Sequence, residues 1–292
     1  MTIPEKKLKN GFAMPVYGIG TWQMGGRRER DPNNDDEGDI QGIRNALDAG
    51  VTHIDTAEIY AGGYSEVLVS KAIKGYDRSK LLIASKARDT SLTYDGILKA
   101  AEASLERVET DYFDLYMAHR WSEHAPVKDV MRALDRLVDE GLIKHIGVSN
   151  FNAAGLKSAM NVVNHPIVAN QVHYNVRARE PESDGLLKFC QQNEVLLVAW
   201  RPLEKGDLAA GAVPELIQEL AKKYNKTPAQ IVLNWLMSQD HVVTLSKTHG
   251  LDHLNENLGS IGWSLDDADI ERIRSEYPNQ LQVSDTVPLA GD

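Results

Sequence analysis

Four side chains in the first part of the chain have the types needed to deliver a proton to a carbonyl oxygen. They are a carboxylate, a phenol, an ammonium and an imidazole: Asp55, Tyr60, Lys86 and His119. A free phenol with a pKa near ~10 is a poor acid at neutral pH, but a nearby lysine favours the phenolate and lowers that pKa. The carboxylate would keep the lysine charged, and the imidazole would hydrogen-bond the oxygen that gains charge. Together they predict proton donation during carbonyl reduction, with the hydride supplied by a cofactor because no side chain provides one.

Each of these residues also has an ordinary explanation when it is taken singly. Asp55 lies in "THIDTAEIYAGG" (52–63), where an apolar run passes into a loop, and a carboxylate there is typical of a helix cap. Tyr60 would then be a loop aromatic, followed by two glycines, Gly62 and Gly63, that permit a tight turn. Whether the four side chains form a site therefore depends on the elements that carry them.

The elements that must position these residues alternate along the chain. Short apolar runs are separated by longer amphipathic stretches, which predicts parallel strands joined by helical crossovers. Eight such units in 292 residues match an α/β fold of the (β/α)8 TIM-barrel class, which needs ~250 residues. A doubly wound open sheet is the alternative, but "GIGTWQMGG" lacks the glycine spacing of a dinucleotide-binding turn. The predicted strands are 15–21, 51–55, 81–86, 112–119, 143–149, 167–171, 195–200 and 242–247.

The predicted helices lie between these strands, with extra helices near the C-terminus. Thr227 suits the cap of one extra helix and Pro228 its first turn, and Ser264 is expected to cap the last helix. No linker or low-complexity segment interrupts the pattern, so we expect one domain over residues 1–292. The predicted helices are 39–49, 65–74, 93–108, 127–140, 152–162, 182–193, 213–224, 227–239 and 251–258, followed by "SLDDADIERIRSEY".

Polar or large amphipathic residues end every predicted strand. In a barrel these ends converge on one rim, where active sites are built, so residues far apart in the sequence become neighbours. A single polar residue at a strand end is common, but a complete set is harder to attribute to chance. The set is Thr21, Trp22, Asp55, Lys86, His119, Ser149, Asn150, Gln171, Trp200, Arg201, Lys247 and Thr248.

These residues and their surrounding segments resemble the aldo-keto reductase family. The resemblance covers nearly the whole chain and is carried by "HIDTAEIY", "LLIASK", "DYFDLYMAH", "LVDEGLIKHIGVSNF", "NQVHYN", "VAWRPL" and "SKTHGLDHLNENL". Several such segments in the right order are far more specific than any single motif. The resemblance implies a (β/α)8 barrel that binds NADP(H) or NAD(H) in extended form and reduces aldehydes or ketones.

The resemblance also implies a role for individual residues. Tyr60 would be the general acid, Lys86 and Asp55 its tuning pair, and His119 the residue that orients the carbonyl. Ser149, Asn150 and Gln171 would hydrogen-bond the nicotinamide carboxamide, and Trp200 would stack on its ring. The remaining expected cofactor contacts are Gly20, Thr21, Trp22, Asp55, Arg201, Pro202, Leu203, Lys247, Thr248, His253, Glu256 and Asn257.

Some positions depart from the family pattern. The family's "AYSPL" is "AWRPL" here, so Trp200 keeps an aromatic face, while Arg201 would either clamp the pyrophosphate or point to solvent. An arginine near the adenosine 2′-phosphate is replaced by His253, a weaker phosphate partner. Lys247 remains, beside a helix N-terminus that favours phosphate. NADP(H) is therefore favoured, with NAD(H) as the alternative.

The expected substrate pocket combines Tyr60 and His119 with two tryptophans, Trp22 and Trp121, whose alternative is ordinary packing. The polar tail 279–292 offers no aromatic grip, which suggests an open pocket for small or polar carbonyls. The charged stretch 25–39 is either a solvated loop or a mobile flap over the active-site face.

Composition excludes several other classes. The net charge of −10 and the lack of a basic block argue against nucleic acid. No signal core or run of about 20 apolar residues appears, so we expect a cytoplasmic protein without membrane contact, as a monomer or weak homo-oligomer. The single cysteine, Cys190, predicts a reduced thiol. No metal site is expected, because no HxH or HExxH cluster appears and five histidines lack ligand spacing: His145, His165, His173, His241 and His249. His53, inside the second predicted strand, is expected to be a core or rim histidine.

Two other functions stay open on the sequence. A barrel lyase would use Lys86 as a Schiff base, although the adjoining Asp55 would hold that lysine charged. A cofactor-sensing subunit with little turnover would keep the same residues. Both are separated from a reductase by direct assay.

Overall fold

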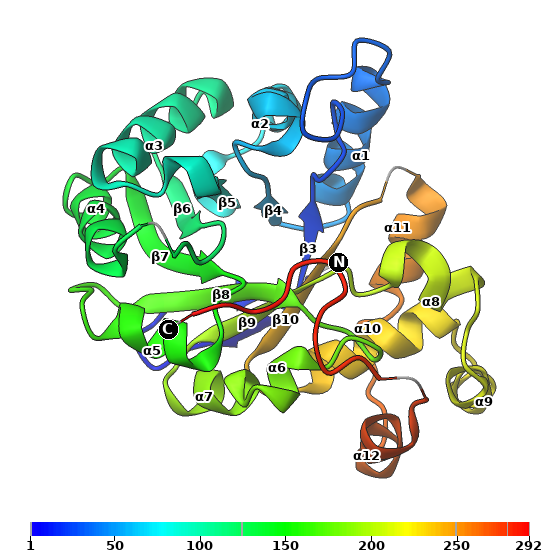
Figure 1. Ribbon diagram of the computed structural model, residues 1–292. Helices are drawn as coiled ribbons and strands as arrows, with labels where there is room; N and C mark the ends of the chain where they lie inside the picture. The colour runs from blue at the N-terminus through cyan, green and yellow to red at the C-terminus, as the bar shows by residue number, and fades with distance from the viewer. Residues whose placement is uncertain (1, 124, 249, 279, 292) are drawn as a thin grey trace.

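Eight parallel strands close into a barrel in the computed structural model, which describes residues 2–123, 125–248, 250–278 and 280–291 (Figure 1). Neighbouring strands follow chain order around the barrel, and β10 closes it against β3. This confirms the predicted (β/α)8 class. The barrel strands are β3 (Tyr17–Gly20), β4 (His53–Asp55), β5 (Leu82–Ala87), β6 (Phe113–Ala118), β7 (Ile143–Ser149), β8 (Ile167–His173), β9 (Leu196–Trp200) and β10 (Val242–Ser246).

Helices surround the barrel and cover the outward faces of its strands (Figure 1). Strand residues such as Ile54, Ile83 and Tyr116 pack outward against apolar helix faces. The described helices are α1 (Asp36–Asp48), α2 (Tyr64–Ile73), α3 (Tyr94–Val108), α4 (Val127–Asp139), α5 (Ala153–Met160), α6 (Glu180–Ser183), α7 (Leu186–Gln192), α8 (Asp207–Ala210), α9 (Glu215–Tyr224), α10 (Pro228–Ser238), α11 (Leu251–Leu258) and α12 (Asp267–Glu276). Short 3-10 turns are η1 (Tyr60–Gly63), η2 (Arg78–Lys80), η3 (Asp89–Ser91) and η4 (Glu204–Gly206).

The helix ends show where local sequence signals were sufficient and where they were not. Thr227 caps α10 in a capping box with Gln230, and Pro228 is its first residue, as predicted. The last helix begins instead at Asp267 after Asp266, so the cap predicted at Ser264 is wrong. The predicted helix 182–193 is two helices, because Gly185 adopts a left-handed φ of 78° between them.

A β-hairpin that the sequence analysis missed closes the bottom of the barrel. Strands β1 (Glu5–Lys7) and β2 (Ala13–Pro15) pair antiparallel around the turn that contains Asn10 and Gly11. Asn10 accepts a hydrogen bond from the Phe12 backbone, and Gly11 has a φ of 96°. Leu8, Phe12 and Met14 join the inner core formed by side chains from the barrel strands. The Asn-Gly pair was the available signal for this hairpin.

The charged stretch 25–39 is held in place by hydrogen bonds. Its last residues form the first turn of α1, which starts earlier than predicted. Asp39 accepts a hydrogen bond from the Gly25 backbone at 2.9 Å. The Arg27 carbonyl accepts one from the backbone N–H of Ala61 at 2.7 Å, which joins this loop to the segment that carries Tyr60. Residues 27–33 are exposed, which agrees with a solvated loop, although these hydrogen bonds hold its two ends. A flap motion stays a prediction.

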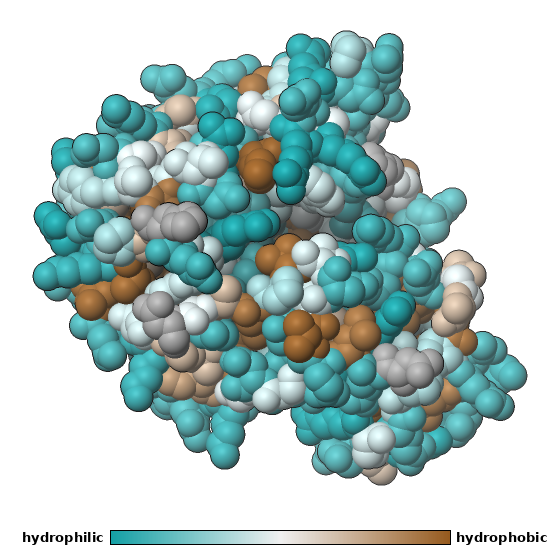
Figure 2. Space-filling model, viewed as in Figure 1, coloured by the Kyte–Doolittle hydropathy of each residue, from teal (hydrophilic) through white to brown (hydrophobic). Residues whose placement is uncertain are grey.

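The C-terminal tail crosses the end of the barrel instead of trailing into solvent (Figure 1). Leu281 pairs with the segment after β8, and Ala290 exchanges backbone hydrogen bonds with Asn150 and Asn152. Figure 2 shows this side of the molecule as largely hydrophilic, with hydrophobic side chains in small groups. Within the described part of the chain, no helix has the length and apolar character needed to span a membrane.

Candidate active site

The ends of β4 and β5 bring the first three predicted catalytic side chains together. The Lys86 ammonium donates to Asp55 Oδ1 and to the Thr56 carbonyl, both at 2.7 Å, and lies 3.4 Å from the Tyr60 hydroxyl. Lys86 and Asp55 are almost fully buried, while Tyr60 is half-buried. Burial of an ion pair without additional partners is costly, and here the Thr56 carbonyl and the Gln171 amide, which donates to Asp55 Oδ2 at 2.8 Å, complete the set.

The loop after β4 has a backbone shape that turns Tyr60 toward Lys86. Ala61, Gly62 and Gly63 follow it with φ values of 52°, 64° and 91°. Gly63 is required for a second reason, because a Cβ there would lie 2.7 Å from the Arg107 side chain. A left-handed alanine is costly for an L-residue, and the hydrogen bond from Ala61 to Arg27 helps to hold it. Asp55 is thus a strand-end partner of Lys86 and no helix cap.

His119 completes the group at the end of β6. Its ring lies 5.8 Å from the Tyr60 ring, centroid to centroid, in an edge-on arrangement. The His119 carbonyl accepts a hydrogen bond from the Asn150 amide at 3.1 Å. Within the described residues neither ring nitrogen of His119 has a hydrogen-bond partner. The ring can therefore donate a hydrogen bond to a substrate oxygen.

Burial and neighbouring charges shift the pKa values of Tyr60, Lys86 and His119. Burial raises the pKa of Tyr60 above its ordinary value near 10, and the Lys86 ammonium opposes this only in part. The lowered pKa expected from the sequence is therefore wrong for the protein alone, because lost hydration outweighs the ammonium. Burial alone would lower the pKa of Lys86, but Asp55 and Tyr60 more than offset it and raise this pKa. Burial, Lys86 and Arg120 hold the pKa of His119 well below its usual range, so its imidazole is neutral at pH 7.

Of the two tryptophans expected to line the substrate pocket, one touches Tyr60 of the predicted catalytic group. Trp22 packs edge-on against Tyr60 with ring centroids 5.0 Å apart, and it is 39% exposed. Trp121 instead packs against Phe151 at 5.1 Å and lines a small cavity beside α4. A pocket wall at Trp121 stays a prediction.

The residues expected around a nicotinamide lie side by side at the ends of β7, β8 and β9. Asn150 donates through its amide nitrogen to Ser149 Oγ and accepts from the Trp200 indole at 3.2 Å. Ser149 donates to the Gln171 carbonyl at 2.8 Å, and Gln171 reaches Asp55. The predicted carboxamide and ring contacts are thereby connected to the Asp55 carboxylate through Gln171.

Arg201 is held by two carboxylates, one on η4 and one on the C-terminal tail. It has a φ of 55°, and its guanidinium pairs with Glu204 at 3.1 Å and with Asp285 of the tail at 3.8 Å. It is therefore not simply directed into solvent. Its Nε is buried and has no partner among the described residues, so a role toward pyrophosphate stays a prediction. Pro202 and Leu203 continue the same segment into η4.

Lys247 lies at the end of β10 and makes no ion pair within the described residues, although it is half-buried. Burial lowers its pKa, and Asp39 opposes this from a distance. The following helix α11 has no side-chain cap at Gly250, so its first N–H groups are available to an anion.

The other residues expected near the adenosine end differ in exposure. His253 is exposed and lies 3.7 Å from Glu256. Asn257 is buried, and its amide donates to Ser246 at 3.1 Å. Gly20, Thr21 and Thr248 are buried at the adjoining strand ends.

These features fit a nicotinamide dinucleotide. A half-buried lysine that has no ion pair among the described residues, beside an uncapped helix N-terminus, suits a phosphate. The flat Trp200 ring and the amides of Asn150 and Gln171 suit an aromatic carboxamide. No group of residues that could hold a metal ion occurs in the described ranges; His249 lies outside them.

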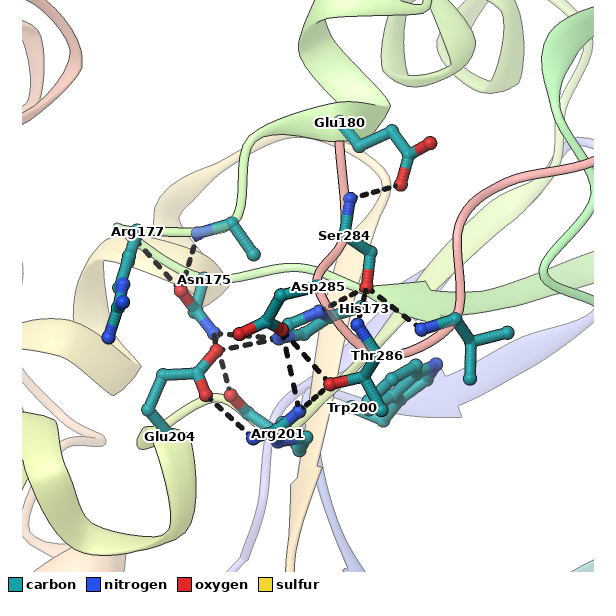
Figure 3. A network of polar contacts seen from close by, with 12 residues as sticks. His173, Asn175, Arg177, Glu180, Trp200, Arg201, Glu204, Ser284, Asp285 and Thr286 are labelled. Carbon is teal, nitrogen blue, oxygen red and sulfur yellow. Dashed lines mark hydrogen bonds and ion pairs between the residues drawn. The ribbon is translucent and has the colours of Figure 1, made fainter. Parts of the chain in front are cut away.

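Several residues that hold the candidate site in place were not predicted from the sequence, because their sequence signals are weak. His173 ends β8 and stacks on Trp200 with ring centroids 4.5 Å apart and an angle of 14° (Figure 3). Glu204, Ser284 and Thr56 also support the site, through a carboxylate, a hydroxyl and a carbonyl. The period-two spacing of Gln171 and His173 was the one available clue, because it places both side chains on the same face of β8.

Comparison with known proteins agrees with this geometry. The model of the aldo/keto reductase family matches residues 17–277. The chain is 34% identical to glyoxal reductase of Bacillus subtilis over 269 residues, which cover 91% of this chain and 90% of that protein. It is 31% identical to methylglyoxal reductase of Escherichia coli K12 over 269 residues, with 91% and 92% covered.

Solved structures give the same result. A thermostable aldo-keto reductase in complex with the inhibitor epalrestat superposes with a TM-score of 0.90 at 39% identity, covering 94% of this chain and 99% of that one. An aldo-keto reductase from Klebsiella pneumoniae in complex with NADPH gives 0.85 at 28% identity, covering 99% of each chain. The chain therefore belongs to the aldo-keto reductase family.

Proposed function

We propose that this protein is an NADP(H)-dependent reductase of small aldehydes or ketones, with Tyr60 as its general acid. The observation that carries the proposal is the position of Lys86, whose ammonium contacts Asp55 Oδ1 at 2.7 Å and the Tyr60 hydroxyl at 3.4 Å. A phenol beside a buried ammonium whose pKa is raised can give up its proton to an oxygen that gains negative charge.

Each side chain has a defined part in the proposed reaction. Reduced nicotinamide, when bound, supplies the hydride. Neutral His119 donates a hydrogen bond to the substrate carbonyl oxygen and holds it near Tyr60. Tyr60 then transfers its proton to that oxygen, while Lys86 stabilises the phenolate left behind. Asp55 keeps Lys86 charged and directed toward Tyr60 throughout.

The same proposal assigns the cofactor-binding residues. Ser149, Asn150 and Gln171 would hold the carboxamide, and Trp200 would stack on the ring. Lys247 would contact the 2′-phosphate of NADP(H), because it is half-buried and has no ionic partner in the described part of the chain. NADPH in a related structure supports this preference, and NAD(H) remains the alternative.

Small dicarbonyls are the proposed substrates. Relatives at 31% and 34% identity are named methylglyoxal reductase and glyoxal reductase. Trp22 is the one aromatic side chain packed on Tyr60 among the described residues besides His119, and it is partly exposed. Such an open site suits compact, polar carbonyls better than large apolar ones.

The direct experiment is steady-state oxidation of NADPH and NADH with glyoxal, methylglyoxal, simple aldehydes and ketoses. We expect NADPH oxidation with at least one dicarbonyl, at a higher kcat/KM than with NADH. Binding of NADPH without turnover of any carbonyl would contradict the proposal and favour a cofactor-sensing subunit. Location in the cytoplasm and a monomeric or weakly oligomeric state also stay predictions.

A Schiff-base lyase is disfavoured by the environment of Lys86. That amine is fully buried, hydrogen-bonded to Asp55 and Thr56, and held charged by a raised pKa. An ammonium is no nucleophile. Borohydride would therefore trap no carbonyl compound on Lys86, and trapping would revive this alternative.

A further inference from the structure

A buried polar network connects the C-terminal tail to the ring of Trp200 (Figure 3). Trp200 and His173 are paired residues at the ends of β9 and β8, and their rings are nearly parallel, 14° apart. His173 therefore covers one face of the indole. A nicotinamide ring can stack only on the opposite face, so the plane of Trp200 decides where that ring would lie.

Both nitrogens of His173 are engaged. Nε2 lies 2.6 Å from Glu204 Oε1, and Nδ1 lies 2.8 Å from Ser284 Oγ. The side chain is 1% exposed. A ring held at both nitrogens and stacked on a second ring has no rotational freedom left, so its partners determine its plane.

The direction of each hydrogen bond follows from the partners. Burial alone would raise the pKa of Glu204. Hydrogen bonds from His173 and Asn175 and the charge of Arg201 outweigh burial and lower this pKa below its usual value. The carboxylate is therefore ionised and acts only as a hydrogen-bond acceptor. His173 Nε2 must therefore carry a hydrogen. Ser284 Oγ accepts from the backbone N–H groups of Thr286 and Val287, at 3.2 and 3.1 Å, so its own hydrogen points to Nδ1. Both ring nitrogens of His173 are thus used by named partners, which fix the orientation of the ring.

The tail is anchored independently of this contact. Glu180 accepts backbone hydrogen bonds from Ser284 at 2.8 Å and from Leu289 at 3.0 Å. Beyond them, Ala290 donates to the Asn150 carbonyl at 3.1 Å. Asn150 in turn accepts from the Trp200 indole. The tail therefore reaches Trp200 by two routes. Ser284 contacts His173, which stacks on one face of the indole, and Ala290 contacts Asn150, which accepts from the indole N–H.

We propose that Ser284 and Glu204 act through His173 to set the plane of Trp200, which makes the C-terminal tail a positioning element for the nicotinamide end of the cofactor. This inference rests on the proposed function, because it assumes that Trp200 receives that ring. Ser284, Glu204 and His173 are positioning residues; none of them is placed against the reacting atoms.

The test compares two ligands in the full-length protein. NADPH contains the nicotinamide, whereas 2′-phospho-ADP-ribose has the same adenosine half without it. For Ser284→Ala, we expect calorimetry to show NADPH binding ~10-fold weaker, as for the loss of one buried hydrogen bond. Binding of 2′-phospho-ADP-ribose should stay within about twofold, because Ser284 does not reach that end.

Ser183→Ala is the matched control. Its hydroxyl also ties the tail to α6, through the Gln282 carbonyl at 2.8 Å, but it does not contact His173. We expect both ligands to bind this variant as they bind the wild type. Equal weakening of the two ligands by Ser284→Ala, or an unchanged affinity for NADPH, would overturn the inference.

The same data separate this inference from the proposed function. A wild-type protein that does not bind NADPH contradicts the proposed function itself. A wild-type protein that binds and oxidises NADPH, with Ser284→Ala indistinguishable from it, contradicts only the role of the tail.

Discussion

Replacing Lys86 with methionine tests how the buried ammonium supports proton transfer. The Lys86 Nζ lies 3.4 Å from the Tyr60 hydroxyl. At an effective dielectric constant of about 20, a unit positive charge at this distance stabilises a phenolate by about 5 kcal/mol. Only part of this charge develops in the transition state, so we expect kcat to fall by ~10²–10³, equivalent to about 3–4 kcal/mol. Affinity for NADPH should change little.

The same substitution has a separate effect on stability. Asp55 would keep Gln171 but lose its cation, and an uncompensated buried charge costs ~3–5 kcal/mol. The double variant Asp55→Asn/Lys86→Met removes both charges and should regain most of this stability, measured by urea unfolding. It should not regain kcat, because the ammonium is still missing.

Lys144→Met is the control for loss of a lysine in the barrel. Lys144 pairs with Asp114 at 3.0 Å, and Asp114 keeps Arg78 at 2.7 Å. We expect its kcat to match the wild type in the carbonyl-dependent NADPH assay. The reasoning is refuted if Lys86→Met keeps more than a third of the wild-type kcat, or if the double variant recovers the rate.

Three further predictions concern other parts of the molecule. His53 is buried with a pKa lowered to about 4 from an ordinary 6.5; the unfolded chain binds its proton first, so the free energy of unfolding should fall by about 3 kcal/mol as pH drops through this window. His53→Asn should remove this share of the pH dependence in urea unfolding and leave the share that comes from His119, and an unchanged pH profile would contradict it. Lys247→Met should weaken NADPH binding at least ~10-fold and NADH binding much less, since a contact with the 2′-phosphate is lost; equal effects on both would rule out that contact. Thr227→Ala should lower the free energy of unfolding by ~1 kcal/mol through loss of the capping box, with activity unchanged.

The barrel and the placement of four polar side chains at its rim were accessible from sequence because each depends on short-range patterns. Apolar runs that end on polar residues mark parallel strands, and barrel geometry then brings Asp55, Lys86 and His119 to one rim. The start of α10 was also predictable from adjacent residues, because Thr227 is its N-cap and Pro228 its first residue. These features need no knowledge of which distant segments touch.

The remaining features depend on contacts between distant segments. The tail packs across β8 through Ser284 and His173, which are separated by 111 positions, and no periodicity reveals such a pairing. Arg201 was weighed between pyrophosphate and solvent, yet a buried carboxylate at Glu204 binds it. The pKa of Tyr60 depends on how much water the folded chain excludes, which the types of its neighbours do not determine.

Tyr60→Phe tests the central claim most directly. The variant keeps the aromatic ring beside Trp22 and His119 and loses only the hydroxyl near Lys86. Calorimetry should show wild-type affinity for NADPH, while NADPH oxidation with methylglyoxal should fall by ~10²–10⁴, the range for loss of a general acid. Full activity in this variant would contradict the assignment of Tyr60 as the proton donor.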